Sequence, residues 1–199
     1  LSDSMVTRKV TFQLPQSVST IGKYAFSTSH WVNNSQLSNA NEIGEYAFQN
    51  SMVFTALKPN DFGLAEPFSL NVPGSITTIA DGTYSYRGIS PASTLEILNI
   101  QSGVTYIGIE AFSGHGALRE VNLPDSLISI DSAAFRDCNS LALVRIPSSV
   151  TNIAEDAFDR EFIVLSVENG SYAAFWAQEN GYGYKYSDTA IDDTSWLND

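Results

Sequence analysis

A repeat of 23 residues is the feature that most constrains the fold of this 199-residue chain. The segment LREVNLPDSLISIDSAAF begins at Leu118, and after five further residues LALVRIPSSVTNIAEDAF begins at Leu141. The two segments share their apolar, Pro, Ser, Ala and Phe positions. A fixed period of this length is typical of stacked solenoid repeats, and it falls in the range of leucine-rich repeats. Each unit is therefore predicted to bury its apolar face against its neighbours.

Four weaker copies precede this pair, and all six copies end in an aromatic anchor. The anchors are Phe26, Phe48, Tyr84, Phe112, Phe135 and Phe158. In the second copy the polar run 33–36 stands where a strand is expected, and in the third copy Thr83-Tyr84 replaces Ala-Phe. The anchors are separated by 22, 36, 28, 23 and 23 residues, so the amino-terminal half carries insertions. They lie at about 58–68 and 85–94, and both contain Pro and Gly, as surface loops do.

Each part of the repeat predicts a local structure. The pattern L-x-x-V-x-L predicts a short strand with one buried face, and the following Pro ends it because it cannot donate to a sheet. The apolar pair Val-x-x-Ile turns the chain around the core, and G-x-x-A-F forms a tight helical or 3-10 turn whose Phe fills the axis. The slot held by Gly22, Gly44 and Gly108 accepts Ala80 and Asp131 in other copies, so no positive φ is expected there. The predicted fold class is an α/β leucine-rich repeat solenoid.

The carboxyl end departs from the repeat and predicts a cap. Ser171 suits a helix N-cap and Gly181 the position after a helix, so 172–180 is predicted to be a short helix. Tyr172, Phe175 and Trp176 are spaced to share the face that covers the last repeat.

Alternating tyrosines at 182, 184 and 186 predict a final strand beyond this helix. The predicted organisation is a single solenoid over residues 1–186, with repeats at about 9–168 and the cap at 169–186. Residues 187–199 are predicted to be an acidic polar tail.

The formal net charge of −12 argues against nucleic acids and anionic membrane surfaces as partners, because both require basic patches. No apolar run approaches the ~20 residues that cross a bilayer, so membrane insertion is not expected. The single cysteine, Cys138, excludes an internal disulfide. It lies three residues after its anchor, where other copies have Ser29, Ser51 and His115, and is predicted to be a small buried thiol.

Reaction chemistry is not indicated. His115 and Cys138 hold equivalent places in adjacent repeats and could approach each other, but no third group is in place to orient the imidazole. Metal-ligand spacing and phosphate-binding glycine patterns are absent from the sequence. The chain is therefore predicted not to be an enzyme, with no catalytic residue, no metal site and no cofactor.

The two segments quoted above resemble the repeat of the BspA-like (Treponema pallidum-type) leucine-rich repeat family. The ending GSYAAFWAQENGYGY also resembles the carboxyl-terminal cap of that family, and the matching positions are Gly170, Ser171, Ala173, Ala177, Asn180 and Gly181. The resemblance covers most of residues 9–186. It implies an extracellular or cell-surface bacterial protein that adheres to host or bacterial surface proteins, to extracellular-matrix proteins or to glycans.

Outward-facing strand positions form columns that a partner could bind. One column, two residues before the proline slot, holds Gln13, Asn71, Asn99, Asn122, Arg145 and Glu168, and its neighbour holds Thr11, Ser69, Ile97, Glu120, Leu143 and Ser166. The asparagines either hydrogen-bond to one another as a ladder, which we favour, or form a polar stripe for a partner. The insertions bring the aromatic residues Phe62, Phe68, Tyr84 and Tyr86, and aromatic residues are favoured as interface anchors.

Our hypothesis is that the loops 58–68 and 85–94, with the adjacent asparagine stripe and Arg145, form the binding surface of a non-enzymatic adhesion module. The alternative is a structural spacer that has no ligand of its own and separates other domains of a larger surface protein.

Overall fold

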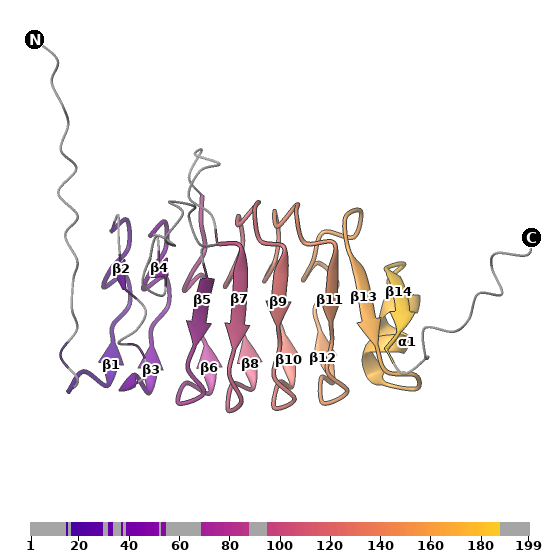
Figure 1. Ribbon diagram of the computed structural model, residues 1–199, viewed down its shortest axis with the longest axis horizontal. Helices are drawn as coiled ribbons and strands as arrows, with labels where there is room; N and C mark the ends of the chain where they lie inside the picture. Colours follow the sequence, from indigo (N-terminus) through magenta and orange to yellow (C-terminus); the bar gives the residue numbers. More distant parts are fainter. Residues whose placement is uncertain are drawn as a thin grey trace, which may run out of the picture.

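The computed structural model describes residues 15, 17–29, 32–33, 37, 39–51, 53–54, 69–87 and 95–187. The chain winds as a solenoid of about six turns, and every strand pairs with strands of the same direction in neighbouring turns (Figure 1). The predicted leucine-rich repeat fold is confirmed. The boundary of the tail stays a prediction, because residues 188–199 lie outside the described residues.

The longer strands form one side of the solenoid, here called the long-strand sheet. They are β5 (Ser69–Val72), β7 (Ile97–Ile100), β9 (Glu120–Asn122), β11 (Leu143–Arg145), β13 (Val164–Val167) and β14 (Gly183–Tyr186). Hydrogen bonds join β5-β7-β9 and β11-β13-β14, and β9 lies beside β11. Two short strands, β2 (Val32–Asn33) and β4 (Val53–Phe54), pair with each other, and β4 lies beside β5. β5, β7, β9 and β11 alternate buried and more exposed positions, as a half-buried sheet requires. In β13, by contrast, Leu165, Ser166 and Val167 are all buried.

A second set of two-residue strands forms the opposite side, where the sequence predicted only a change of direction. These strands are β1 (Thr20–Ile21), β3 (Glu42–Ile43), β6 (Thr78–Ile79), β8 (Tyr106–Ile107), β10 (Ser129–Ile130) and β12 (Asn152–Ile153). In each strand the isoleucine is buried and the preceding polar residue or tyrosine faces outward. The turn that leads into them starts at the proline, as in the hydrogen bond from Leu127 N to Pro124 O.

The aromatic anchors stack along the solenoid axis, as the repeat predicted. Phe26, Phe48, Tyr84, Phe112, Phe135 and Phe158 follow one another with centroid separations of 5.5, 5.5, 5.4, 5.5 and 5.2 Å. Neighbouring ring planes differ by no more than 14°. The spacing is close to that between hydrogen-bonded strands, so one ring occupies each turn of the core.

The turns that carry the anchors are joined by backbone hydrogen bonds. The anchor amide donates to the residue before the next anchor, for example Phe26 N to Ala47 O at 2.8 Å and Phe135 N to Ala157 O at 2.9 Å. No positive φ occurs at Gly22, Gly44 or Gly108, as predicted. The left-handed residue lies instead two positions before the anchor, with φ between +53° and +59° at Tyr24, Tyr46, Gly82, Glu110 and Ala133. A residue in this conformation cannot continue a right-handed helix, so the segment forms successive hydrogen-bonded turns.

The carboxyl-terminal cap contains the predicted helix and strand. Helix α1 (Tyr172–Glu179) starts at Ser171, whose hydroxyl accepts a hydrogen bond from Ala174 N, and Gly181 follows it with φ +69°. The buried face differs from the prediction. Trp176 is buried together with Ala173, Ala174 and Ala177, whereas Tyr172 and Phe175 are 38% and 61% exposed. The three alanines let the helix lie close to the last turn, which leaves room for only one large ring.

Two register predictions were wrong. Asn33 belongs to β2, so the polar run of the second copy does contain a short strand. In the last turn Leu143 pairs with Val164 and Arg145 with Ser166, so Ser166 lies in the column of Arg145 rather than that of Leu143. The reason is a shorter connection, because six residues separate Phe158 from Val164 and eight separate Phe135 from Leu143.

Candidate functional site

The asparagine stripe is a hydrogen-bonded ladder on the outer face of the long-strand sheet. Asn71, Asn99 and Asn122 are paired in register across β5, β7 and β9. Asn99 Nδ2 donates to Asn71 Oδ1 at 2.9 Å, and Asn122 Nδ2 donates to Asn99 Oδ1 at 2.8 Å. The favoured structural interpretation is confirmed. Because amides in a ladder satisfy one another, the stripe is a fixed polar surface rather than a row of independent side chains.

Replacing Asn99 by alanine removes both ladder hydrogen bonds. We expect the free energy of unfolding to fall by about 1 kcal/mol, since one of the lost bonds is partly buried and the other is exposed. Chemical denaturation measures this loss. The matched control in the same column is Arg145→Ala, which breaks only the exposed ion pair with Asp125 at 3.3 Å and should cost less than about 0.5 kcal/mol. Equal effects of the two substitutions would contradict a stabilising ladder.

Beside the ladder, the outer face of the sheet carries exposed aliphatic side chains. Leu143 on β11 is 44% exposed, and its partner Val164 on β13 is 40% exposed. Ile97 on β7 is partly exposed in the same column. Glu120 on β9 is exposed in this column too, and its carboxylate accepts a hydrogen bond from Asn122 Nδ2 at 2.9 Å. The described face thus combines an amide ladder, a few aliphatic side chains, one carboxylate and the Arg145–Asp125 pair.

Three of the four aromatic residues proposed for binding are not seen on this surface. Phe62 and Phe68, with the whole loop 58–68, lie outside the described residues. The prediction that Tyr84 contacts a partner was wrong. Its side chain is 3% exposed because its ring takes the place of phenylalanine in the axial stack. A side chain enclosed in this way cannot contact a partner.

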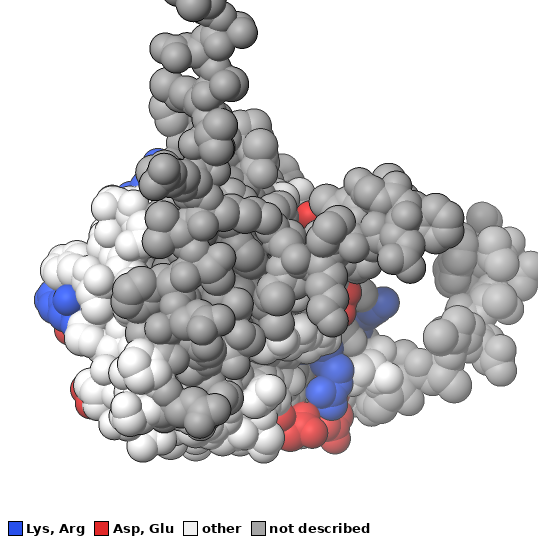
Figure 2. All heavy atoms as spheres, turned by 60° about the vertical axis from the view of Figure 1, so that its left-hand side comes forward, with Lys and Arg blue, Asp and Glu red and all other residues white. Residues whose placement is uncertain are grey.

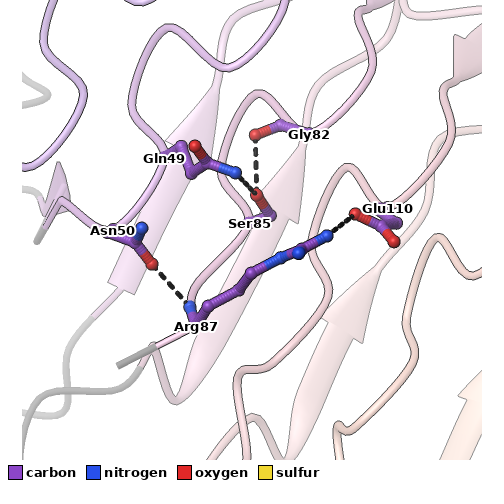
Figure 3. Close-up of polar contacts among 6 residues, drawn as sticks. All are labelled: Gln49, Asn50, Gly82, Ser85, Arg87 and Glu110. Atoms are coloured by element: carbon purple, nitrogen blue, oxygen red, sulfur yellow. Dashed lines mark hydrogen bonds and ion pairs between the residues drawn. The ribbon is translucent and has the colours of Figure 1, made fainter. Parts of the chain in front are cut away.

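Tyr86 and Arg87 form the base from which the second insertion leaves the solenoid. The Tyr86 ring stacks on His115 with centroids 6.0 Å apart. Arg87 N donates to Asn50 Oδ1 at 2.6 Å, and the Arg87 guanidinium forms an ion pair with Glu110 (Figure 3). The adjacent Ser85 is buried. Residues 85–87 therefore belong to the scaffold, and the variable part of this loop is confined to 88–94, outside the described residues.

Both insertions join the described chain on neighbouring strands. The segment 55–68 ends where β5 begins at Ser69, and 88–94 ends shortly before β7 begins at Ile97. Ser69 and Ile97 are paired in register. The carboxyl ends of the two insertions thus lead into neighbouring strands, at the end of the sheet where the strands that carry the asparagine ladder begin.

The position three residues after the anchor holds a hydrogen-bond donor aimed at the preceding copy. The Ser51 hydroxyl donates to Phe26 O, His115 Nε2 lies 2.7 Å from Tyr84 O, and Cys138 Sγ lies 3.4 Å from Phe112 O. Each partner carbonyl belongs to an anchor. The predicted buried thiol is confirmed, and His115 and Cys138 both bind backbone rather than each other in the described contacts. Ser, His and Cys have only this ability to donate in common. The sequence analysis therefore did not recognise the position as a recurring hydrogen-bond donor.

The Cys138 thiol is expected to be inert in the native protein. Burial is the main cause that raises its pKa, to about 12, so only ~1 thiol in 10⁴ is ionised at pH 8. We expect labelling by a thiol reagent to be slower than in the guanidinium-unfolded chain by roughly a hundredfold or more. Absorbance of the released chromophore measures both rates, and comparable rates would show that the position is accessible.

A hollow of about 600 Å³ lies at the carboxyl-terminal end of the turns, between the last anchor and the cap. Its lining includes Arg136, Asp159, Phe162 and Tyr182. The Arg160 guanidinium lies over the Tyr182 ring, 5.3 Å from its centroid, and 3.8 Å from Glu155. Two further carboxylates of the lining, Asp156 and Asp159, accept hydrogen bonds from Ser132 Oγ and Asp137 N. No cluster of three or more potential metal ligands occurs among the described residues.

Five of the seven described basic side chains form ion pairs with carboxylates. The ion pairs are Lys23–Glu45, Arg87–Glu110, Arg119–Glu96, Arg145–Asp125 and Arg160–Glu155. Figure 2, which brings the amino-terminal side forward, shows blue and red side chains beside one another. Within the described ranges, no helix has the length and apolar character to cross a membrane.

Comparison with known proteins identifies the repeat. A family model described as the BspA type leucine rich repeat region matches six copies, over residues 6–64 and 90–169. The unmatched interval includes the third copy, which has the Thr83-Tyr84 exchange. No curated protein sequence matches the chain.

Two solved structures are similar to the chain at low identity. A leucine rich cell surface protein from Faecalibacterium prausnitzii is 19% identical, with a TM-score of 0.49, and the match covers 93% of this chain and 55% of that one. A leucine-rich repeat protein from Bacteroides ovatus is 21% identical, with a TM-score of 0.37, covering 77% and 44%. The chain spans about half the length of these structures.

Proposed function

The chain belongs to the BspA-type leucine-rich repeat family, and on that premise we propose that it is a non-enzymatic protein-binding module of a bacterial cell-surface or secreted protein. Its partner is a host or bacterial surface protein or an extracellular-matrix protein, with a glycan as the alternative ligand. Solenoid proteins commonly bind through an extended surface built from successive repeats.

The observation that carries the proposal is that the two insertions are followed by strands that pair with each other. These strands, β5 and β7, begin at Ser69 and Ile97, which are paired in register. Directly beyond these points lie the asparagine ladder and, two turns further on, the exposed Leu143. Binding loops on a rigid scaffold are the usual place for recognition. A mixed surface of amides and single aliphatic groups suits a protein partner, because interfaces as a whole are only moderately apolar.

The test is a binding screen of the purified chain against immobilised extracellular-matrix proteins and a glycan panel at physiological salt. A loop-replaced variant exchanges 58–68 and 88–94 for short Gly-Ser connections and keeps 85–87, which belong to the scaffold. We expect saturable binding by the natural chain and none by the loop-replaced variant, although circular dichroism shows both to be folded.

Two point variants locate the surface on the sheet. Leu143→Ser changes an exposed aliphatic residue on the proposed face, and Ile128→Ser changes one that is similarly exposed, at 49%, next to the short strand β10. We expect Leu143→Ser to weaken binding several-fold and Ile128→Ser to leave it unchanged. If the loop-replaced variant still binds, the binding surface does not lie at these loops. A folded natural chain that binds none of the probes would favour the spacer function instead.

A further inference from the structure

The same tripeptide, Glu-Asn-Gly, stands at both ends of helix α1. Glu168-Asn169-Gly170 lies between β13 and the helix, and Glu179-Asn180-Gly181 closes the helix. An asparagine followed by glycine can deamidate spontaneously, because the missing Cβ of glycine lets its backbone nitrogen reach the asparagine side-chain carbonyl. Since the local sequences are identical, any difference between the two sites comes from the fold.

The first site lies in an exposed two-residue turn. Ser171 N donates to Glu168 O at 3.1 Å, which places Asn169 and Gly170 at the centre of the turn. Gly170 has φ +75°, as the third residue of a type II turn requires. Both central residues are exposed, and a Cβ at Gly170 would have no neighbour within 4 Å. The Gly170 amide, whose nitrogen would make the attack, has no hydrogen bond within the described residues.

The second site is held by the end of the helix. Asn180 Nδ2 donates to Trp176 O at 2.8 Å, and the backbone amide of Asn180 donates to the same carbonyl at 3.0 Å. The nitrogen that would attack, Gly181 N, donates to Gln178 O at 3.3 Å. The next amide, Tyr182 N, is bound to Ala177 O at 2.9 Å, and the Tyr182 ring is buried against Trp176. Attack at Asn180 therefore requires this end of the cap to open.

We propose that Asn169 is a deamidation site of the folded protein and that the fold protects Asn180. In the reaction Gly170 N loses its proton and attacks Asn169 Cγ. The new Cγ–N bond closes a succinimide ring, and the Cγ–Nδ2 bond breaks as ammonia leaves with the proton. Water then opens one of the two ring C–N bonds, which gives aspartate or isoaspartate at position 169.

The position of each asparagine on the helix also decides what the reaction would do to the cap. A carboxylate at 169 lies just before the N-terminus of α1, where the helix dipole favours negative charge. A carboxylate at 180 would lie at the C-terminus, where the dipole disfavours it, and would lose the Nδ2 donor to Trp176 O. The reactive site is thus the one whose aspartate product the helix tolerates.

The test incubates the folded chain in mildly alkaline buffer and follows both sites by tandem mass spectrometry. Residue-level fragmentation is needed because Arg160 and Lys185 are the nearest trypsin sites and place both asparagines in one peptide. We expect conversion at Asn169 to be about tenfold faster or more, since Asn180 reacts only in molecules whose helix end has opened. In guanidinium the two rates should become similar, because the flanking tripeptides are identical.

Two sets of variants complete the experiment. Asn169→Gln should abolish the fast conversion while it keeps an amide at this position. Asn169→Asp should leave the thermal midpoint unchanged or raise it, whereas Asn180→Asp should lower it. Equal rates at the two sites in the folded chain, or faster conversion at Asn180, would overturn the proposal.

Discussion

Replacing Phe135 by alanine is expected to lower the free energy of unfolding by about 3–5 kcal/mol. Phe135 is 1% exposed and lies between two rings of the axial stack, 5.5 Å from Phe112 and 5.2 Å from Phe158. Its removal opens a cavity that the neighbouring turns cannot fill, because their backbones are joined by hydrogen bonds such as Phe135 N to Ala157 O. Urea denaturation followed by circular dichroism measures the loss.

Phe175→Ala is the matched control for this experiment. The same side chain is removed from the cap helix, where it is 61% exposed, so the free energy of unfolding should change by no more than about 0.5 kcal/mol. A loss below about 1 kcal/mol at Phe135 would contradict its place in a closely packed axis. A loss at Phe175 as large as that at Phe135 would contradict the observed burial of α1.

The repeat was readable from the sequence because one physical requirement recurs in every turn. Each turn must supply a ring to the axis and a buried residue to each sheet, and the anchors from Phe26 to Phe158 meet that requirement with little variation. The cap helix was predicted for a local reason, since Ser171 and Gly181 satisfy its two ends. Its buried face was not, because the spacing of Tyr172, Phe175 and Trp176 does not show how closely the alanines approach the last turn.

Backbone conformation escaped prediction where the residue type varies. The left-handed position before the anchor is held by tyrosine, glycine, glutamate and alanine, for example Tyr46 and Ala133. No composition signal marks it, because hydrogen bonds to the neighbouring turns impose the conformation. The two-residue strands were missed for a similar reason, since a single buried isoleucine such as Ile130 gives no periodicity to detect.

The candidate site was predicted in part. The ladder of Asn71, Asn99 and Asn122 followed from the alternation of strand positions and the regular period. Tyr84 was assigned both to the anchor column and to the binding surface, and the structure supports only the first. The predicted column of Ser166 was wrong, because the last connection is two residues shorter than the one before it. This shortening cannot be recognised in the sequence, since the repeat pattern has already ended there.

A second large loss of stability is expected when the pH is lowered, because His115 is buried in the folded chain. Its Nε2 lies 2.7 Å from Tyr84 O and therefore carries the proton, and its buried Nδ1 has no partner among the described residues. Burial is the main cause that lowers the pKa of His115 to about 4, whereas an unfolded histidine has a pKa of about 6.5. Between these values the unfolded chain binds a proton that the folded chain does not.

Stability from this group is therefore fully present above about pH 6.5 and is lost as the pH falls toward about 4. We expect the free energy of unfolding to drop by about 2 kcal/mol between pH 7 and pH 5, in addition to the change caused by the carboxylates. The control is His115→Ser, since serine fills the same slot at position 51 and its hydroxyl also donates to an anchor carbonyl. Urea denaturation of both proteins at each pH isolates the histidine contribution as the difference between their slopes. Identical slopes would mean that His115 is protonated as easily in the folded chain as in the unfolded one, which its enclosure between Tyr86 and the axial turn of Tyr84 argues against.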